Sequence, residues 1–399
     1  MDPRTLSIQD YTYDLPEARI AQQPLAERDA SKLLLFDKGV IRDHSFRSLP
    51  DLIPSNALLV LNNTKVVNAR LIFHRASGAR IEVLCLSPVE GKPVELAFVE
   101  SGSSEWECFI GNAKRWKAGE ELIATANGLE IRAMRKGQES IRLAWTPVEL
   151  SFVEVLDRIG HVPRPPYMKR PDEAADKTRD NTVFAQYDGS VAAPTASLHF
   201  TKEILDRIVQ RGIRSTDLTL HVGAGTFLPV KSATMDQHAM HSEQVRIPLK
   251  MLLQLSEQLG KGPVIPVGTT ALRTLESIYW HGVKLLRRIG SNVIDIDQWD
   301  SYSYDENDLP TPKDALNAVI MSLMEKKEYQ LSGETKLLIA PGYTFRFATG
   351  LVTNFHQPQS TLLLLVAAFL GKDWRSVYDH ALASDYRFLS YGDGSLLLP

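Results

Sequence analysis

The sequence predicts an α/β (or α+β) main domain, built on a mostly parallel or barrel-like sheet, with a small all-β barrel domain inserted into it. Three observations lead to this prediction. The chain has 399 residues, 44% hydrophobic and 23% charged, which is ordinary for a folded chain of two or three domains. Short segments of alternating apolar and polar residues fill positions 70–145. After position 146, strands alternate with helices.

Composition excludes several classes of protein. The longest apolar run, residues 362–370, is about half of a membrane span, and the N-terminus lacks the apolar core of a secretory signal. Two cysteines, Cys85 and Cys108, are too few for a disulfide framework or a cysteine zinc site. The net charge of −3 indicates that any nucleic acid is held by a local patch. We therefore expect a cytoplasmic protein.

Residues 1–69 are expected to open the main domain. A helix bracketed by prolines is predicted at residues 17–22, and a strand at residues 32–36. Within residues 57–71 we expect a buried strand. It ends at the polar run 62–64, whose side chains can cap a turn.

Residues 70–145 are expected to form the inserted barrel. Six short segments have the alternation of half-buried strands, and glycines separate them at turn-like intervals. The expected strands are residues 79–86, 94–100, 106–111, 120–126, 129–135 and 140–145.

Residues 146–399 return to the main domain, which is therefore discontinuous and comprises residues 1–69 and 146–399. Helices are predicted at residues 151–159, 201–210, 249–259, 269–279, 361–370 and 374–383, with strands at 215–222, 264–267, 337–339 and 351–355. Residues 299–333 are polar and proline-bearing, with a helix at 314–326, and predict a peripheral insertion.

Small and polar residues recur where these strands end, in VAAPTASLHFT, TLHVGAGT, VIPVGTTALRTLES, LLIAPGYTF and LVTNFHQPQST. Ligands of open α/β sheets bind at the carboxyl ends of strands, so five such ends favour one shared site over separate turns. HVGAGT has the spacing of neither a phosphate loop nor a dinucleotide loop. The candidate residues are Pro194, Thr195, His199, His221, Gly223, Gly225, Thr226, Thr269, Thr270, Asn354 and His356.

Two further segments leave alternatives open. His238 and His241 have the i, i+3 spacing of metal ligands, but they lack the H-E-x-x-H pattern, so no metal is expected. A hydrogen-bonding role, an acid/base role and no role are the alternatives. The proline-rich segment 158–179 carries basic and aromatic residues that suit phosphates and a stacked base, and the alternative is a solvated loop. Its candidates are Arg164, Tyr167, Lys169 and Arg170.

A longer series of motifs carries a resemblance. DLPEARIAQQPLAERDASKLL, LVLNNTKVVNARL, GHVPRPPY, VAAPTASLHF, LHVGAGTFLPV, MHSE, VGTTALRTLES, APGY, LVTNFHQPQSTLLLLVAAF and YRFLSYGDGSLL follow one another along the chain. In this order they resemble the S-adenosylmethionine:tRNA ribosyltransferase-isomerase family of queuosine biosynthesis. The resemblance implies transfer of the ribosyl part of S-adenosylmethionine to 7-aminomethyl-7-deazaguanine at the tRNA wobble position. Epoxyqueuosine forms, and adenine and methionine leave.

The resemblance also implies roles for individual residues. The reaction needs acid–base groups, for which His199, His221 and His356 are the candidates. Thr269, Thr270 and Arg273 are expected to hold the methionine carboxylate, and the glycines after His221 to let the backbone approach the nucleoside. Asn354, Tyr391 and Asp393 are expected to bind base edges. No permanently bound cofactor or metal is expected, and the partners are S-adenosylmethionine and a tRNA anticodon stem-loop, bound by a monomer.

The chain departs from the family pattern at four positions. Asp180 and Asn181 stand where the family has a Tyr-Gln pair, Ser197 replaces a glycine and Leu228 replaces a glutamine. These departures keep two alternatives open, a paralogue that uses S-adenosylmethionine on a different nucleobase or RNA, and a non-catalytic RNA-binding protein.

Overall fold

The computed structural model describes residues 2–117, 119–170, 173, 175–223, 225, 230 and 232–399. The chain forms two compact units. The large unit comprises Met1–Thr64, Thr182–Gln186 and Ala193–Pro399, and the small unit comprises Lys65–Asn181 and Tyr187–Ala192. The small unit is thus wider than the predicted insertion at residues 70–145, because the segment after residue 146 packs onto its strands.

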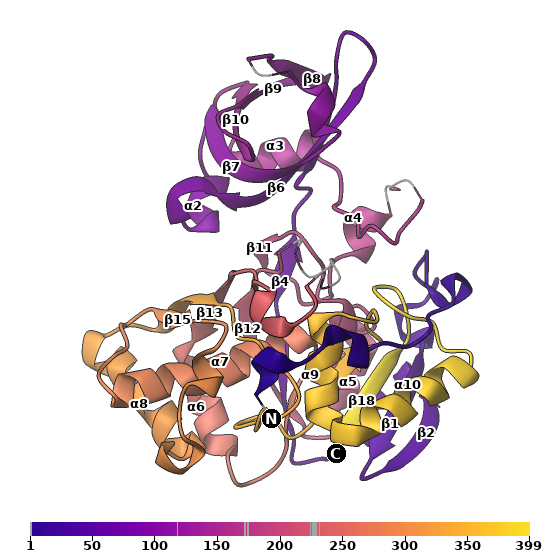
Figure 1. Ribbon diagram of the computed structural model, residues 1–399, viewed down its shortest axis with the longest axis vertical. Coiled ribbons are helices and arrows are strands. Elements are labelled where there is room, and N and C mark those ends of the chain that lie inside the picture. Colours follow the sequence, from indigo (N-terminus) through magenta and orange to yellow (C-terminus); the bar gives the residue numbers. More distant parts are fainter. Residues whose placement is uncertain are drawn as a thin grey trace. The chain divides into compact units, whose positions relative to one another are not determined.

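Six antiparallel strands in the order β5-β6-β7-β10-β9-β8 form the core of the small unit. They are β5 (Arg70–His74), β6 (Arg80–Pro88), β7 (Ser103–Gly111), β8 (Leu122–Ala126), β9 (Leu129–Arg135) and β10 (Ser140–Thr146). β5 also lies beside β8, so the sheet curls into a nearly closed barrel, as Figure 1 shows. Along β9, Leu129, Ile131 and Ala133 are buried between more exposed neighbours, which is the pattern of a strand with one face in a core.

One predicted strand of the small unit is wrong. Residues 94–100 instead contain α2 (Val94–Phe98), and the sixth strand is β5. Val94, Ala97 and Phe98 are buried, which is helical i, i+3, i+4 spacing, and Pro93 precedes the helix. Helical periodicity over five residues is too short to be told from strand alternation by pattern alone.

Two short helices and two short strands accompany the barrel. α3 (Phe152–Ile159) begins after Ser151, whose backbone N–H donates to the Glu154 carboxylate at 2.9 Å in a capping box. Phe152 of this helix packs among the barrel aromatics Trp106 and Trp145. α4 (Asp176–Arg179) is one turn, and the short strands β4 (Thr64–Val66) and β11 (Tyr187–Ser190) pair with each other.

A six-stranded sheet in the order β14-β3-β12-β13-β16-β15 lies in the large unit. Its strands are β3 (Leu58–Asn62), β12 (Arg214–Leu220), β13 (Glu243–Pro248), β14 (Val264–Pro266), β15 (Ile294–Ile296) and β16 (Gln330–Thr335). β14, β3 and β12 are parallel, but β13 is antiparallel to both of its neighbours. β15 and β16 are also parallel, so three of the five strand pairs are parallel, as expected, and the two pairs of β13 make the sheet mixed. No crossover helix joins β12 to β13 within the described residues.

A second sheet of the large unit has the order β17-β18-β1-β2, with β17 (Leu351–Asn354), β18 (Gly394–Leu398), β1 (Lys32–Asp37) and β2 (Val40–Ser45). Val352 of β17 also forms a parallel bridge with Val267, which follows β14. The two sheets therefore meet along β14 and β17. The core beneath this junction includes Leu59, Ile265 and Leu396.

The predicted helices of the large unit are confirmed as α5 (Lys202–Gln210), α6 (Leu249–Gln258), α7 (Thr269–Leu286), α8 (Pro312–Lys326), α9 (Thr361–Leu370) and α10 (Trp374–Ala383), beside a one-turn α1 (Leu49–Leu52). The Thr201 hydroxyl accepts from the Ile204 N–H at 3.3 Å and caps α5 as expected. The predicted helix at residues 17–22 is instead a single 3₁₀ turn, Glu17–Arg19.

Residues 299–333 are built into the large unit and are not peripheral. α8 packs so closely on α7 that a Cβ at Gly282 would lie 2.2 Å from the Ala315 carbonyl oxygen. The end of this segment enters β16 and pairs with β13. The strand predicted at residues 337–339 is absent there, because the sheet pairing occurs at β16 just before it.

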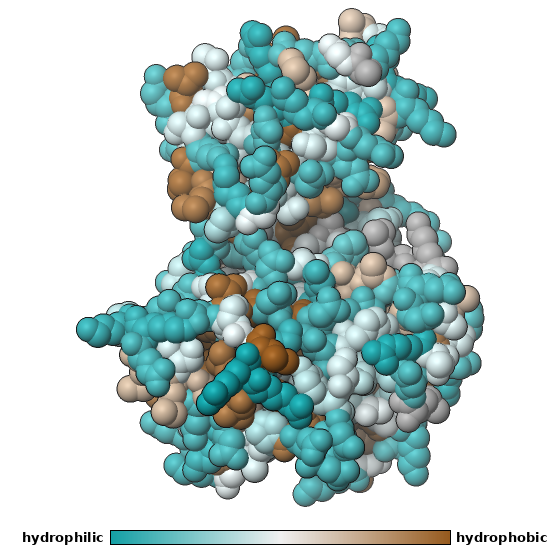
Figure 2. All heavy atoms as spheres, turned by 60° about the vertical axis from the view of Figure 1, so that its left-hand side comes forward, coloured by the Kyte–Doolittle hydropathy of each residue, from teal (hydrophilic) through white to brown (hydrophobic). Residues whose placement is uncertain are grey.

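Figure 2 shows hydrophilic residues over most of the visible face, with hydrophobic residues in small separate patches. Within the described residues, none of the helices has the length and apolarity needed to cross a membrane.

Candidate functional site

The carboxyl ends of four strands meet at one edge of the large unit. β14, β3 and β12 are parallel neighbours, and the bridge between Val267 and Val352 adds β17 in the same direction. Site residues predicted from the sequence lie at the ends of β12, β14 and β17. At the end of β3 lies Asn62, which was not among the predicted site residues. We define the carboxyl edge as Asn62, Thr64, His221, Gly223, Thr269, Thr270 and Asn354. The structure thus brings together residues that are far apart in the sequence.

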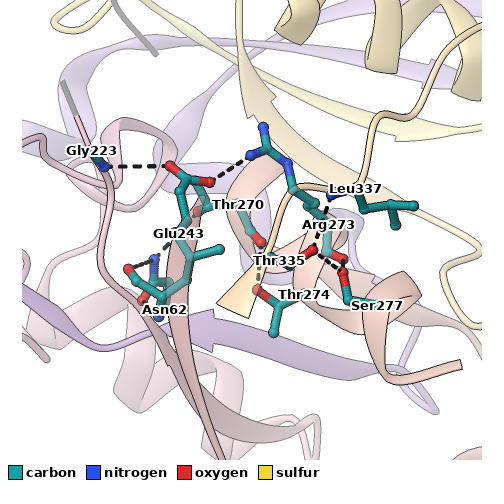
Figure 3. Close-up of polar contacts among 10 residues, drawn as sticks. Asn62, Gly223, Glu243, Thr270, Arg273, Thr274, Ser277, Thr335 and Leu337 are labelled. Atoms are coloured by element: carbon teal, nitrogen blue, oxygen red, sulfur yellow. Dashed lines mark hydrogen bonds and ion pairs between the residues drawn. The ribbon is translucent and has the colours of Figure 1, made fainter. Parts of the chain in front are cut away.

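Asn62 joins three of these strand ends (Figure 3). Its Oδ1 accepts from the N–H groups of Leu220 at 3.0 Å and Thr64 at 3.2 Å. Its Nδ2 donates to the Leu220 carbonyl at 3.0 Å and to the Thr270 hydroxyl at 3.4 Å. A buried amide that bonds on both sides fixes β3, β12 and the start of α7 relative to one another.

His221 lies directly after β12 and is buried. Its Nδ1 is 2.8 Å from the Thr64 hydroxyl, and its backbone N–H donates to the Gln244 carbonyl at 3.0 Å. Both the backbone and the ring of His221 are therefore held in place.

Glu243 and Arg273 form a buried ion pair beside these glycines (Figure 3). Arg273 Nη1 lies 2.5 Å from Glu243 Oε2, and the Gly223 N–H donates to Oε1 at 3.4 Å. Burial raises the pKa of the Glu243 carboxyl, and the Arg273 charge opposes that rise. Arg273, expected to hold a substrate carboxylate, already contacts a carboxylate of the protein.

The start of α7 faces the Pro194-Thr195 turn. Gly268 precedes the helix at φ +95°, where an L side chain is strained, and a Cβ there would lie 3.9 Å from that of Ala196. Pro194 precedes the 3₁₀ turn Thr195–Ser197 that carries Ala196. The structure therefore brings Pro194 and Thr195 next to the start of α7, where Thr269 and Thr270 are buried.

His199 lies next to Asn354, the carboxyl-edge residue that closes β17. His199 Nδ1 is 2.9 Å from the Ser31 hydroxyl, and its Nε2 and the Oδ1 of Asn354 have no hydrogen-bond partner within 3.5 Å in the described structure. Burial lowers the pKa of His199 to about 4, although the negative charge of Asp393 acts to raise it. Asn354 Nδ2 donates to the Leu389 carbonyl at 3.1 Å.

Tyr391 and Asp393 are buried near His199, on the segment that leads into β18. The two oxygens of Asp393 accept from the backbone N–H groups of Lys32 at 3.0 Å and Arg387 at 2.7 Å. Asp393 therefore ties together the chain around β1 and β18.

His356 has its own set of partners. Its Nε2 is 2.9 Å from the Thr353 hydroxyl, its N–H donates to Tyr378 Oη at 3.1 Å, and its carbonyl accepts from the Tyr13 hydroxyl. Burial lowers its pKa to about 4. This set of contacts is that of a neutral, well-packed imidazole.

The glycine segment after His221 is described at Gly223 and Gly225, whereas Thr226 and Leu228 lie outside the described residues. A Cβ at Gly225 would lie 1.9 Å from Cδ2 of His241. His241, from the H-x-x-H pair, therefore packs directly on this backbone, and only glycine fits beneath its ring.

The basic candidates lie in the small unit. Arg164 pairs with Asp176, and Arg170 donates to the same carboxylate at 2.7 and 3.1 Å. Although burial acts in the opposite direction, hydrogen bonds from Arg170 and the charge of Arg164 lower the pKa of Asp176. Both arginines are largely buried by this carboxylate, whereas Lys169 is exposed and Tyr167 is half-buried.

The structure shows the contacts of Asn181 and the burial of Ser197, two of the residues that depart from the family pattern. The Asn181 side chain accepts from the Val66 N–H at 2.8 Å and donates to the Lys177 carbonyl at 3.2 Å. Ser197 is fully buried in the Thr195–Ser197 turn. Asn181 thus has a structural role inside the small unit.

In the part of the chain that the structure describes, no three His, Cys, Asp or Glu side chains gather as metal ligands would. Sequence reasoning missed Thr64, Glu243 and Ser31 as neighbours of the candidate histidines and arginine. Their position next to the recognised motifs was the one available signal, since Thr64 follows Asn62-Asn63 and Glu243 closes MHSE.

Comparisons with known proteins find relatives along the whole chain. The family described as "Queuosine biosynthesis protein" matches residues 8–397. A relative from Azoarcus sp., named S-adenosylmethionine:tRNA ribosyltransferase-isomerase, is 41% identical over 395 residues, 98% of this chain and 98% of that protein. A relative of the same name from Cereibacter sphaeroides is 37% identical over 401 residues, 99% of each chain.

A solved structure, the S-adenosylmethionine tRNA ribosyltransferase of Thermotoga maritima, is 27% identical with a TM-score of 0.47, and the match covers 98% of this chain and 100% of that one. The family match and the full-length relatives lead to one conclusion. The chain belongs to the queuosine biosynthesis protein family.

Proposed function

We propose that this chain is an S-adenosylmethionine:tRNA ribosyltransferase-isomerase. It transfers the ribosyl part of S-adenosylmethionine to 7-aminomethyl-7-deazaguanine at the wobble position of tRNA, forms epoxyqueuosine and releases adenine and methionine. Relatives with this enzyme name, 41% and 37% identical over nearly the full chain, support it. The structural observation that carries it is the carboxyl edge, where four neighbouring strands end: Asn62 closes β3, His221 follows β12, Thr270 follows β14 and Asn354 closes β17.

The donor binds at the carboxyl edge. Thr269, Thr270 and Arg273 hold its methionine carboxylate, and the glycine backbone of Gly223 and Gly225, with Thr226, approaches the nucleoside. The sulfonium makes the neighbouring C–H bonds acidic, so a positioned base starts the reaction and an acid assists departure of adenine.

His221 is the acid–base group of this proposal. It lies beside the glycines, and Thr64 fixes its ring at 2.8 Å. His199 and His356, with pKa values of about 4, are neutral at pH 7. They act as hydrogen-bonding groups around the reacting centre, His199 together with Asn354 and beside Pro194 and Thr195. Tyr391 and Asp393 support base recognition from the segment before β18.

The acceptor is the anticodon stem-loop. Lys169 and Tyr167 contact its phosphates and a base, and Arg164 and Arg170 hold this segment in shape through Asp176. The enzyme acts in the cytoplasm as a monomer, with S-adenosylmethionine as a substrate and no metal.

Adenine release from S-adenosylmethionine tests the proposal, measured with tRNA that carries 7-aminomethyl-7-deazaguanine and with unmodified tRNA. Release that depends on the modified tRNA is expected. Release with neither tRNA, while S-adenosylmethionine still binds, would contradict the proposal and point to another nucleobase or RNA.

A further inference from the structure

The ion pair of Glu243 and Arg273 has too few partners for its burial. Both residues are buried, with 3% and 4% of their surfaces exposed, and the two side chains come from different elements, the start of β13 and the second turn of α7. Burying two opposite charges costs several kcal/mol, which is offset only when further hydrogen bonds satisfy the remaining donors and acceptors.

Most of the hydrogen-bonding capacity of this pair is unused by the described residues. A guanidinium has five N–H donors, and Arg273 makes one hydrogen bond among them, from Nη1 to Glu243. A carboxylate accepts about four hydrogen bonds, and Glu243 receives two, one of them the long contact of 3.4 Å from the Gly223 N–H. The remaining groups adjoin the glycine segment.

A second buried carboxylate, on the helix α7 that also carries Arg273, provides the contrast. Glu276, also fully buried, accepts from the Tyr343 hydroxyl and from the N–H groups of Arg346, Phe347 and Ala348, at 2.8 to 3.2 Å. All of its acceptor sites are therefore filled by the protein, as expected of a structural carboxylate. Glu243 and Arg273 lack such a set, although Arg273 lies one turn before Glu276 on α7.

The unused groups are complementary to an α-amino acid. The outer edge of a guanidinium binds a carboxylate through two parallel hydrogen bonds, and a carboxylate oxygen accepts from an ammonium. The two charges of an amino-acid zwitterion are close enough to engage an adjacent Arg and Glu at once. The donor substrate of the proposed reaction ends in such a zwitterion.

We propose that Glu243 binds the α-ammonium group of the methionine part of the donor, while Arg273 binds its α-carboxylate. This inference rests on the proposed function and adds Glu243 to its binding residues. The pair is then a subsite selective for intact α-amino acids, and the Gly223 N–H aligns the carboxylate of Glu243 within it.

Calorimetric binding to the full chain tests the subsite without tRNA. The probes are L-methionine, 4-(methylthio)butanoate, which lacks the amine, and 3-(methylthio)propylamine, which lacks the carboxylate. The wild-type protein is expected to bind L-methionine at least about tenfold more tightly than either truncated probe, a difference of about 1.4 kcal/mol. Equal affinities for the three probes would overturn the proposal.

Variants then assign each charge. Glu243→Gln is expected to weaken L-methionine about tenfold and leave 4-(methylthio)butanoate unchanged, and Arg273→Lys to weaken both carboxylate probes. Glu257→Gln, an exposed glutamate on α6, is the matched control and should change nothing. If Glu243→Gln weakens all three probes equally, the residue only shapes the backbone and the subsite is refuted.

A substitute variant and the measurement of adenine release distinguish failure of the subsite from failure of the proposed reaction. Glu243→Asp keeps the charge on a shorter side chain, so it replaces Glu243→Gln should that variant fail to fold, and it should weaken L-methionine but not 4-(methylthio)butanoate. Zwitterion-selective binding without adenine release would sustain the subsite and reject the proposed reaction. Adenine release with an unchanged KM for S-adenosylmethionine in Glu243→Gln would sustain the reaction and reject the subsite.

Discussion

At the scale of single residues, three histidines of the large unit differ in what surrounds their rings. His221 contacts a threonine hydroxyl beside the glycine segment, whereas His199 and His356 are buried with pKa values of about 4. An acid–base catalyst at neutral pH works best with a pKa near 7. The burial of His199 and His356 therefore suits them to hydrogen bonding in the neutral form.

His221→Gln is expected to slow tRNA-dependent adenine release by about 100-fold or more, the usual effect of losing an acid–base group. Thr64→Val should slow it less, because the ring stays but loses its partner at 2.8 Å, and Thr64→Ser should restore the rate. Single-turnover kinetics at saturating S-adenosylmethionine measures this. A normal rate in His221→Gln would remove the residue from catalysis.

The free energy of unfolding should decrease as the pH falls, because of His199. Its pKa drops from 6.5 to about 4 on folding, so the unfolded state binds more protons between these values. Stabilisation that is complete above pH 6.5 is lost as the pH falls towards 4. Between pH 7 and pH 5 this histidine should remove about 2 kcal/mol from the free energy of unfolding.

Urea unfolding at both pH values checks this in His199→Gln, which should lose less stability than the wild type on acidification. His74→Gln, at an exposed position of β5, is the control and should behave as the wild type. An identical pH dependence in His199→Gln and the wild type would contradict a neutral, buried His199.

At the scale of elements, the entry into α7 decides the shape of the donor site. Gly268 has φ +95° and faces the turn that carries Ala196, while Gly260, after α6, has φ +77° and open space within 4 Å of where a Cβ would lie. Gly260→Ala should cost about 1 to 2 kcal/mol of stability, because its positive φ is a conformation that L side chains rarely adopt. Gly268→Ala should cost about 1 to 3 kcal/mol, because φ +95° with ψ 149° is a conformation essentially restricted to glycine.

Only Gly268→Ala should also impair the donor site, with a KM for S-adenosylmethionine raised about tenfold, because Thr269 and Thr270 shift with the start of the helix. Steady-state kinetics of both variants separates the two effects. Equal KM values would mean that the start of α7 does not contact the donor.

At the scale of the whole molecule, the net charge of −3 leaves tRNA binding to a local surface. Lys169→Ala should raise the KM for tRNA about threefold without changing that for S-adenosylmethionine, and should lower the salt slope of tRNA binding by about 1. Lys250→Ala, an exposed lysine of α6, is the control. Unchanged tRNA binding in Lys169→Ala would exclude the segment 158–179 as a phosphate contact.

Arg164→Ala should behave differently from Lys169→Ala. Its guanidinium pairs with the buried Asp176, so its loss leaves a partly uncompensated carboxylate and should destabilise the small unit by about 3 to 5 kcal/mol. Denaturant unfolding measures this. A stable Arg164→Ala variant with weakened tRNA binding would instead favour the direct phosphate contact that its sequence suggests.

The sequence by itself determined the helices of the large unit, most strands of the barrel and the family. These features are local in sequence: the cap Thr201 is next to its helix, the apolar spacing of α9 and of α10 lies within each helix, and each motif is one continuous segment. Short elements such as α2 could not be predicted from the sequence, because five residues are too few to distinguish helical from strand periodicity.

Only the tertiary structure decided which polar residues meet. Glu243 and Arg273 are thirty positions apart, and they pair because β13 lies next to β12 while α7 packs against β12, β3 and β14. The sequence suggested phosphate contacts for Arg164 and Arg170, but Asp176 pairs with both. Partner choice among charges depends on sheet order and burial, which are properties of the assembled fold and not of any local stretch.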